Sequence, residues 1–324
     1  MKVLITGGAG FIGFHLAKFL LSKGYDIILV DNFYRGEKDS DFSQLLERKN
    51  VKFINFDLLS QKEISILEDD INFIIHLAAI IGVQNVVKKP FNVLDDNVKM
   101  LSNIIAFSKR QKNLKKFLFA STSEVYAGTL ANFNLDIPTP ELSPLALSDI
   151  SHPRTTYMLS KIYGEAMCIH SGLPYVIFRP HNFYGPRMGM SHLIPEQLKK
   201  IFLASEGDFI DVYSLEHSRT FCYIDDAIQM IEFLMSSNKV LNDTFNLGWS
   251  FPEYKIKDII NICHSNQDKS VYLREVLDIN ASPLRRAPKM DKLFDMKKFK
   301  QTHLEQGVKL TREWYEKNYF CTLK

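Results

Sequence analysis

The strongest constraint on the fold is a regular alternation of short apolar runs with longer segments of helical period. Helix-like segments such as FIGFHLAKFLLSKG (11–24) and NVKMLSNIIAFSKRQ (97–111) separate strand-like runs rich in β-branched residues: KVLIT (2–6), DIILVD (26–31), VKFINFD (51–57), INFIIHLAA (71–79) and KKFLFAST (115–122). Such alternation predicts an α/β fold, with a parallel sheet covered by helices on both faces. The runs are apolar on both sides, as is typical of buried parallel strands.

After the strand-like run PYVIFRP (174–180) the pattern changes to shorter elements. An irregular loop HNFYGPRMGMSH (181–192), a helix over about 195–203 and a proline-punctuated segment SPLRRAPK (282–289) follow. The segment FCYIDDAIQMIEFLM (221–235) nevertheless has the pattern of a further strand and helix of the first layer. We therefore predict a first domain over 1–180 that also receives about 220–248, and a smaller, interleaved C-terminal α/β lobe, mainly 181–324, for the substrate.

Composition and charge argue against several classes of protein. Lys and Arg total 40 against 37 Asp and Glu, and the small excess is scattered, which argues against nucleic acid as a partner. No apolar run approaches the roughly 20 residues of a membrane helix. The first strand begins directly after Met1 and leaves no room for a signal peptide, so we expect a cytoplasmic protein that does not bind a membrane. The cysteines form no CxxC pair and the histidines show no ligand spacing, so no metal site is expected.

A glycine-rich turn between the first strand and the first helix predicts a phosphate-binding site. Gly7, Gly10 and Gly13 stand three residues apart there, so that backbone N–H groups and a helix N-terminus can approach a pyrophosphate. Asp31 ends the second strand, where a carboxylate can bind the ribose 2′-hydroxyl of NAD and repel the extra phosphate of NADP. Asp57 follows the third strand, on the adenine side. Together these features predict a Rossmann-type, doubly wound domain that binds NAD.

Tyr157 and Lys161 stand four residues apart in the helical segment TTYMLSKIYGE (155–165) and therefore share one helix face. Tyrosine has an unperturbed pKa of about 10, so it can act as a base only beside a cation, which Lys161 and a nicotinamide ring can supply. Upstream, the fifth strand ends in the hydroxyls and carboxylate of STSEVY (121–126), at the sheet edge where ligands of such folds bind. By themselves these patterns also fit a solvated helix face and a capping turn.

Taken in order, the motifs resemble the extended short-chain dehydrogenase/reductase family, and more narrowly its NAD-dependent nucleotide-sugar epimerases and dehydratases. The resemblance covers nearly the whole chain and lies in Gly7-Gly8-Ala9-Gly10-Phe11-Ile12-Gly13, His76-Leu77-Ala78-Ala79, Ser121-Thr122-Ser123-Glu124-Val125-Tyr126, the pair Tyr157 and Lys161, and Asn182-Phe183-Tyr184-Gly185-Pro186.

This resemblance implies roles for individual residues. Tyr157 would take the proton of a sugar hydroxyl that Thr122 also binds, while Lys161 would hold the ribose and lower the tyrosine pKa. Glu124 completes the implied catalytic set. The implied NAD contacts are Gly7, Gly10, Phe11, Ile12, Gly13, Asp31, Asn32, Asp57, Leu58, Leu77, Ala78, Ala79, Asn97, Tyr157 and Lys161. A nucleotide-diphosphate sugar would contact Ser123, Asn182, Arg219 and Arg286, because arginine binds phosphate oxygens bidentately.

The sequence leaves open the fate of the ketone that oxidation of the sugar hydroxyl produces. Rotation of the ketosugar and return of the hydride gives 4-epimerisation, loss of a carboxylate gives decarboxylation, and loss of water gives 4,6-dehydration. Ser123-Glu124 resembles the pair of uronate decarboxylases, but the stretch between Ala127 and Tyr157 lacks the pattern of that group. The preferred interpretation is C4 epimerisation of a nucleotide hexose or hexuronate. UDP-glucuronate decarboxylation, 4,6-dehydration and release as a 4-ketoreductase are the alternatives.

Two further expectations concern the class of protein and its assembly. A non-catalytic module that senses NAD predicts loss of at least one of Thr122, Tyr157 and Lys161, and all three are present. A homologous fold would support a homodimer through the helices around 93–112 and 155–171. Apolar side chains on those helices fit either that interface or internal core: Met100, Ile104, Ile105, Met158 and Ile162.

Overall fold

The computed structural model describes residues 1–147, 149–265, 269–276 and 283–322. The chain forms two compact units whose segments alternate along the sequence. The first unit comprises Met1–Asn134, Glu141–Pro180 and Ile228–Leu247. The second comprises Leu135–Pro140, His181–Ala227 and Gly248–Lys324.

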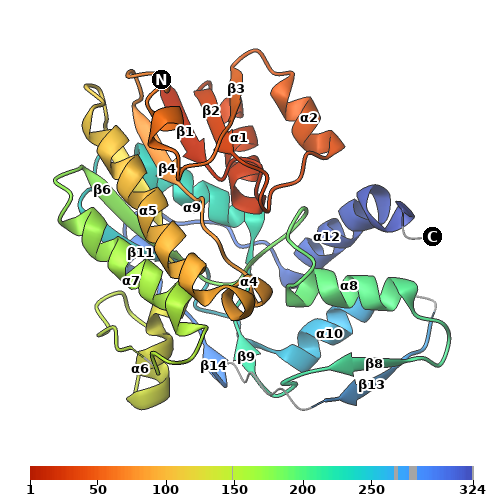
Figure 1. The fold of residues 1–324 in the computed structure, drawn as a ribbon. Coiled ribbons are helices and arrows are strands. Elements are labelled where there is room, and N and C mark those ends of the chain that lie inside the picture. Colours follow the sequence, from red (N-terminus) through yellow and green to blue (C-terminus); the bar gives the residue numbers. More distant parts are fainter. Residues whose placement is uncertain (148, 266–268, 277–282, 323–324) are drawn as a thin grey trace. The chain divides into compact units, whose positions relative to one another are not determined.

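A seven-stranded parallel sheet organises the first unit, as the alternation of the sequence predicts (Figure 1). Its strands, in spatial order, are β11 (Asp243–Leu247), β6 (Tyr175–Pro180), β5 (Lys116–Ala120), β4 (Phe73–His76), β1 (Lys2–Thr6), β2 (Asp26–Asp31) and β3 (Val51–Asn55). The order reverses its direction between β4 and β1, and ligands of doubly wound folds bind at such a switch point, beyond the carboxyl ends of the strands.

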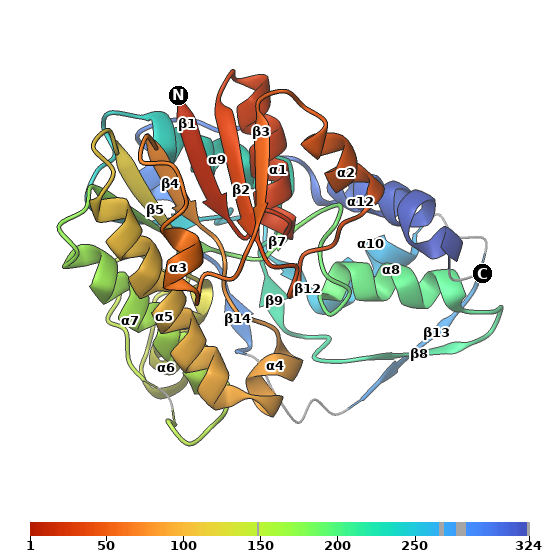
Figure 2. The ribbon, with the colours of Figure 1, turned by 45° about the horizontal axis from the view of Figure 1, so that its top comes forward.

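Helices cover both faces of this sheet. Figures 1 and 2 show α5 (Pro90–Lys109) and α7 (Thr155–Ile169) side by side on one face, and α1 (Phe11–Ser22) and α9 (Ile224–Ser236) on the other. The shorter helices of this unit are α2 (Ser40–Leu46), α3 (Gln61–Ile64), α4 (Val83–Lys88), the 3-10 turn η1 (Ser123–Tyr126) and α6 (Ala127–Asn132). Among the described residues, no helix combines the length and apolar character needed to cross a bilayer.

The core of the first unit includes four of the five side chains for which the sequence allowed either a dimer interface or the core; the fifth, Ile162, is partly buried. Met100, Ile104 and Ile105 on α5 are buried in the cluster that packs α5 against the sheet, and Met158 on α7 is 3% exposed. These four side chains are internal core, because α5 and α7 turn their apolar faces toward the strands rather than outward. A dimer, which stays a prediction, would need other residues of these helices.

The second unit contains small sheets and a group of helices. Its strands are β7 (Phe183–Tyr184), β8 (Phe209–Val212), β9 (Ser218–Arg219), β10 (Cys222–Tyr223), β12 (Tyr254–Lys255), β13 (Tyr272–Glu275) and β14 (Arg285–Arg286). Its helices are α8 (Leu193–Leu203), α10 (Ile256–His264), α11 (Asp291–Phe294), α12 (Leu304–Asn318) and the 3-10 turn η2 (Phe320–Thr322). Side chains of α8, α10, β8 and β13 share a small apolar core.

One predicted strand lies in a different sheet. The strand expected at the start of FCYIDDAIQMIEFLM is β10, which pairs with β7 in a two-stranded sheet and does not join the large one. The large sheet receives β11 instead, alongside β6. The sequence prediction was wrong on this strand because two residues, Cys222 and Tyr223, suffice for a short ladder, whereas the helix that follows them extends into the first unit.

Candidate active site

The glycine-rich turn joins β1 to α1 in the first unit. Gly7 has a φ of +71°, and a Cβ built there would lie 2.9 Å from the backbone nitrogen of Ala78. A Cβ on Gly13 would lie 2.3 Å from the carbonyl oxygen of Gly7. The residue before α1 is Gly10. Glycine has no side chain, so no side-chain hydrogen bond caps the first turn. The N–H groups of Phe11 and Ile12 therefore begin a helix whose positive dipole end suits an anion.

The carboxylate of Asp31, at the end of β2, is fixed by the backbone on both sides. Its Oδ2 accepts a hydrogen bond from the Ala9 N–H at 3.0 Å, and its Oδ1 accepts one from the Phe33 N–H at 2.8 Å. Burial raises the pKa of Asp31, while the backbone donors oppose that rise. A carboxylate offers about four acceptor sites, so capacity remains for a hydroxyl donor.

Two loops beyond the strand ends complete this edge. Asn32 donates from Nδ2 to Asp57 Oδ2 at 3.1 Å, which joins the loops after β2 and β3, and Leu58 is buried behind Asp57. After β4, the Ala78 N–H donates to Thr6 Oγ1 at 3.3 Å, which ties the segment Leu77–Ala79 to the end of β1.

Asn97 lies on α5, and hydrogen bonds to the backbone of this chain account for the burial of its side chain. Its Oδ1 accepts from the Ile80 N–H at 2.7 Å and its Nδ2 donates to the Ile80 carbonyl at 3.1 Å. It thereby anchors the loop that follows β4. Asn97 therefore stabilises the loop beside the predicted cofactor residues.

The predicted catalytic tyrosine and lysine lie on α7 with Thr122 nearby. The Thr122 hydroxyl lies near enough to Tyr157 to lower its pKa, and Lys161 Nζ lies 5.9 Å from the centroid of the tyrosine ring. Lys161 Nζ also donates to the Ala120 carbonyl at the end of β5, at 2.8 Å. Burial lowers the pKa of Lys161 to about 8. Burial raises the pKa of Tyr157, and the Thr122 hydroxyl opposes that rise.

Glu124 lies in the turn that follows β5, close to the same tyrosine. The Glu124 N–H donates to Thr122 Oγ1 at 3.2 Å, so Thr122 caps η1 and fixes the start of the turn. The negative charge of Glu124 adds to the rise in the pKa of Tyr157. Ser123, between the two, is 6% exposed. The structure therefore brings Thr122, Glu124 and Tyr157 together, as the sequence predicts for the carboxyl edge of a parallel sheet.

The three remaining candidates lie in the second unit. Asn182, with a φ of +44°, donates from Nδ2 to the Thr220 carbonyl at 2.8 Å. The pairing of β14 with β9 places Arg286 opposite Arg219, and both side chains are at least nine-tenths buried. The terminal nitrogens of Arg219 donate to the carbonyls of Ser218 at 2.7 Å and Leu284 at 3.2 Å, and to the carbonyl of Pro283. Two buried arginines at paired strand positions bring positive charge that suits an anionic ligand.

Sequence reasoning missed a buried polar network beneath η1. It includes Tyr126, Glu165 and Arg179, which are all 4% exposed or less. One signal was available: Arg179 is a lone charged residue in the apolar run of β6, and Glu165 continues the four-residue spacing of Tyr157 and Lys161. The pairing itself joins residues far apart in sequence.

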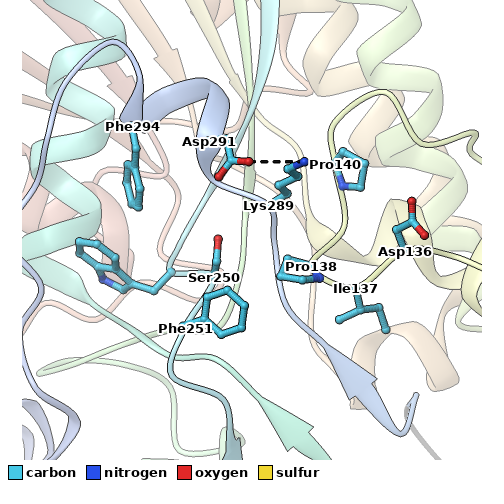
Figure 3. Close-up of a pocket in the computed structure, with 10 residues that line it drawn as sticks. Asp136, Ile137, Pro138, Pro140, Ser250, Phe251, Lys289, Asp291 and Phe294 are labelled. Atoms are coloured by element: carbon cyan, nitrogen blue, oxygen red, sulfur yellow. Dashed lines mark ion pairs between the residues drawn. The ribbon is translucent and has the colours of Figure 1, made fainter.

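The sequence also gave no sign of a cavity of about 690 Å³ that lies wholly in the second unit. Figure 3 shows Lys289 and Asp291 forming an ion pair of 3.4 Å at its wall. The lining residues include none of the predicted site residues and are Asp136, Ile137, Pro138, Pro140, Trp249, Ser250, Phe251, Lys289, Asp291 and Phe294.

Comparison with known proteins decides the family. The model of the NAD-dependent epimerase/dehydratase family matches residues 3–248. The chain belongs to this family. It is an enzyme with NAD as cofactor, of the group of nucleotide-sugar epimerases, dehydratases and decarboxylases.

Several members of the NAD-dependent epimerase/dehydratase family match over nearly the whole chain. UDP-N-acetyl-α-D-glucosaminuronate decarboxylase of Bacillus cytotoxicus is 31% identical over 97% of each chain. UDP-glucose 4-epimerase of Thermotoga maritima, solved with UDP-glucose, is 25% identical over 100% of each chain, with a TM-score of 0.81. UDP-glucuronic acid 4-epimerase of Bacillus cereus, solved with UDP-glucuronic acid and NAD, is 25% identical over 98% of this chain and 99% of its own, with a TM-score of 0.84.

The first unit fits the cofactor of this family. The positions of Gly7 and Gly13 admit no side chain, which leaves backbone N–H groups free of steric cover at the start of α1. Asp31, held by two backbone donors, keeps acceptor capacity for a ribose hydroxyl. These features fit a dinucleotide without a 2′-phosphate.

Proposed function

We propose that this enzyme decarboxylates a nucleotide-linked hexuronate by way of a 4-keto sugar. The observation that carries the proposal is the position of Glu124, whose backbone N–H donates to Thr122 Oγ1 and whose negative charge raises the pKa of Tyr157. A 4-epimerase does not need a second acid at this place. The near full-length similarity to the decarboxylase of Bacillus cytotoxicus supports the same reaction.

In the first step, Tyr157 takes the proton of the sugar 4-hydroxyl, which Thr122 holds by a hydrogen bond. Lys161 provides the positive charge that stabilises the tyrosinate, because its ammonium group lies on the same helix face. NAD, when bound, accepts the hydride from C4. Phe11, Ile12 and Asp31 would hold the cofactor at its pyrophosphate and ribose.

The proton inventory of the second step assigns a task to Glu124. The 4-keto group makes the C5 carboxylate a β-keto acid, which loses carbon dioxide and leaves an enolate. C5 must then gain a proton, but the proton on Tyr157 is needed again at the 4-oxygen, which is a hydroxyl in the product. A second acid is therefore required. We assign this task to Glu124, whose backbone N–H is held by Thr122 and whose charge acts on Tyr157.

The second unit supplies the anion contacts of this proposal. Arg219 and Arg286 would bind the diphosphate or the hexuronate carboxylate, and Asn182 would assist from the loop before β7. Among the matched relatives and structures, the named substrates are UDP-sugars in several cases, which supports uridine as the base.

C4 epimerisation, the interpretation preferred from the sequence, is the second candidate. It needs only Thr122, Tyr157 and Lys161, and the fold match to the Bacillus cereus UDP-glucuronic acid 4-epimerase favours it. Both candidates begin with the same oxidation, so they differ only in the fate of the ketone.

The test is incubation with UDP-glucuronate and with UDP-N-acetylglucosaminuronate in deuterated water. Decarboxylation yields carbon dioxide and a pentose carrying one deuterium at C5. Glu124→Gln should slow steady-state turnover by about 100-fold or more, because the acid that protonates C5 is lost, while the absorbance of reduced nicotinamide builds up. Glu47→Gln, an exposed glutamate, is the matched control. An isomer of unchanged mass, without carbon-bound deuterium, would replace decarboxylation by epimerisation.

A further inference from the structure

A buried ion pair lies beneath the turn that carries the candidate catalytic residues. Glu165 on α7 and Arg179 on β6 face each other bidentately, with Arg179 Nε 2.8 Å from Glu165 Oε1 and the second terminal nitrogen 2.6 Å from Oε2. Each residue is 4% exposed. The contact is charge-assisted and planar, the geometry in which an arginine is held most firmly.

The same ion pair binds both ends of the segment Ser121–Tyr126. The Ser121 hydroxyl donates to Glu165 Oε1 at 2.5 Å. The Tyr126 hydroxyl accepts from an Arg179 terminal nitrogen at 2.6 Å. Thr122 and Glu124 lie between these two attachment points. The ion pair thus fixes the start and the end of the segment that presents them.

Further contacts prevent the pair from moving as a whole. Tyr126 donates from its hydroxyl to Asn246 Oδ1 on β11 at 2.9 Å, and Arg179 also donates to the Glu141 carbonyl at 2.9 Å. The side chain of Glu141 in turn accepts from the Asn246 N–H at 3.0 Å. Strands β5, β6 and β11 are therefore linked at their carboxyl ends by side chains of one network.

Helix α7 connects this network to the tyrosine. Tyr157, Lys161 and Glu165 follow at intervals of four residues and so lie along one face of the helix. Lys161 binds the Ala120 carbonyl, and Glu165 binds the hydroxyl of the next residue, Ser121. Successive turns of α7 thus hold successive residues at the end of β5, and the position of Thr122 relative to Tyr157 follows from both contacts.

Stability alone does not account for such a pair. Replacing a buried ion pair by apolar side chains of similar volume is often neutral or stabilising, because the desolvation of two charges offsets their attraction. The pair adds a fixed geometry for the groups it binds, here Ser121 and Tyr126.

We propose that Glu165 and Arg179 are positioning residues that set the distance between Thr122 and Tyr157 by clamping the segment Ser121–Tyr126. This proposal rests on the proposed roles of Thr122 and Tyr157, but not on the fate of the ketone. The group that Thr122 and Tyr157 would bind is the 4-hydroxyl of a nucleotide sugar. Oxidation of that hydroxyl requires both side chains at once.

The first test uses Ser121→Ala, Tyr126→Phe and the double variant of the two, which remove the clamp and leave the ion pair intact. Ser108→Ala is the matched control, because that buried hydroxyl bonds the Ile104 carbonyl within α5 at 2.7 Å. We expect kcat of the double variant to fall by about 10- to 100-fold, as a displacement of about 1 Å produces. KM and NAD affinity should stay at the values of the control, whereas the melting temperature should fall below it because Asn246 Oδ1 loses its buried donor. A crystal structure of the double variant should show Thr122 farther from Tyr157 than in the wild-type enzyme.

The second test replaces the ion pair itself by Glu165→Met together with Arg179→Met, which avoids leaving one buried charge alone. The double Met variant should fold and show the same loss of kcat as the clamp variant, whereas Arg179→Met alone should also lose stability. A kcat equal to that of Ser108→Ala in either double variant would overturn the proposal.

Tyr157→Phe, in the same assay of reduced nicotinamide, separates failure of the positioning proposal from failure of the proposed active site. If this variant is inactive while the clamp variants match the control, positioning fails and the site stands. If it oxidises the sugar normally, the role of Tyr157 fails and the positioning proposal fails with it. A wild-type enzyme that epimerises instead of decarboxylating leaves the positioning proposal standing, because the oxidation is common to both reactions.

Discussion

The substitution Gly13→Ala tests how closely the turn after β1 is built around its cofactor. A methyl group at this position would lie 2.3 Å from the Gly7 carbonyl oxygen and 2.9 Å from the Gly8 Cα. Such contacts essentially do not occur below 3.0 Å, so the start of α1 and the turn must separate by at least about 0.7 Å. The neighbours are backbone atoms, which cannot rotate away as a side chain would.

Two opposing effects set the change in stability. Overpacking of this kind costs about 1–3 kcal/mol, and alanine in place of glycine inside a helix returns about 1 kcal/mol. The free energy of unfolding should therefore fall by only about 0–2 kcal/mol. NAD affinity should fall much further, because the N–H groups of the first helical turn move away from the pyrophosphate. Loss of one charge-assisted hydrogen bond costs about 1.5–3 kcal/mol, which corresponds to a Kd about 10- to 150-fold higher.

Gly24→Ala is the matched control for this substitution. Gly24 has a φ of +80°, and a Cβ there meets nothing within 4 Å. Alanine should cost about 1–2 kcal/mol of unfolding free energy through backbone strain alone, without altering NAD affinity. Urea unfolding and calorimetric titration with NAD measure both quantities for the two variants. Equal NAD affinities for Gly13→Ala and Gly24→Ala would refute the steric argument.

Two more predictions concern charge in the first unit. Asp31→Asn should lower the ratio of NAD to NADP affinity by about tenfold, because an amide no longer repels a 2′-phosphate; an unchanged ratio in competition titrations would exclude this role. Lys161 releases its proton at about pH 8 in the folded chain but at about 10.5 in the unfolded chain. The unfolded state therefore binds more protons between these values, and stability should rise with pH there by up to about 3 kcal/mol relative to Lys161→Met. The unfolding free energies of the wild type and of Lys161→Met would be measured in urea at several pH values. If both changed equally with pH across that range, the low pKa of Lys161 would be contradicted.

The sequence was sufficient for the parts of the fold that depend on local pattern. Apolar strands of four to six residues alternating with amphipathic helices predicted the parallel sheet. The spacing of Tyr157 and Lys161 placed both on one helix face. The polar cluster after β5 indicated the carboxyl edge of the sheet, and only the family resemblance implied that Thr122 acts with Tyr157. The sequence left two interpretations open where an apolar side chain can face either a partner subunit or the core. Met100 and Met158 fit both environments by spacing, and only the packing of α5 and α7 on the sheet identifies them as core.

The network beneath η1 marks the limit of local pattern. Tyr126 and Asn246 are 120 residues apart, and Arg179 is 53 residues from Tyr126. They meet because β11 pairs with β6, a pairing that the sequence analysis does not predict. A charged side chain in a buried strand predicts a partner, since an unpaired buried charge is costly, but the identity of that partner depends on the strand order. The residues that position a catalytic group are therefore harder to read from sequence than the group itself. Tyr157 stands out by a spacing within one helix, whereas Arg179 acquires its role only when three strands and α7 are in place.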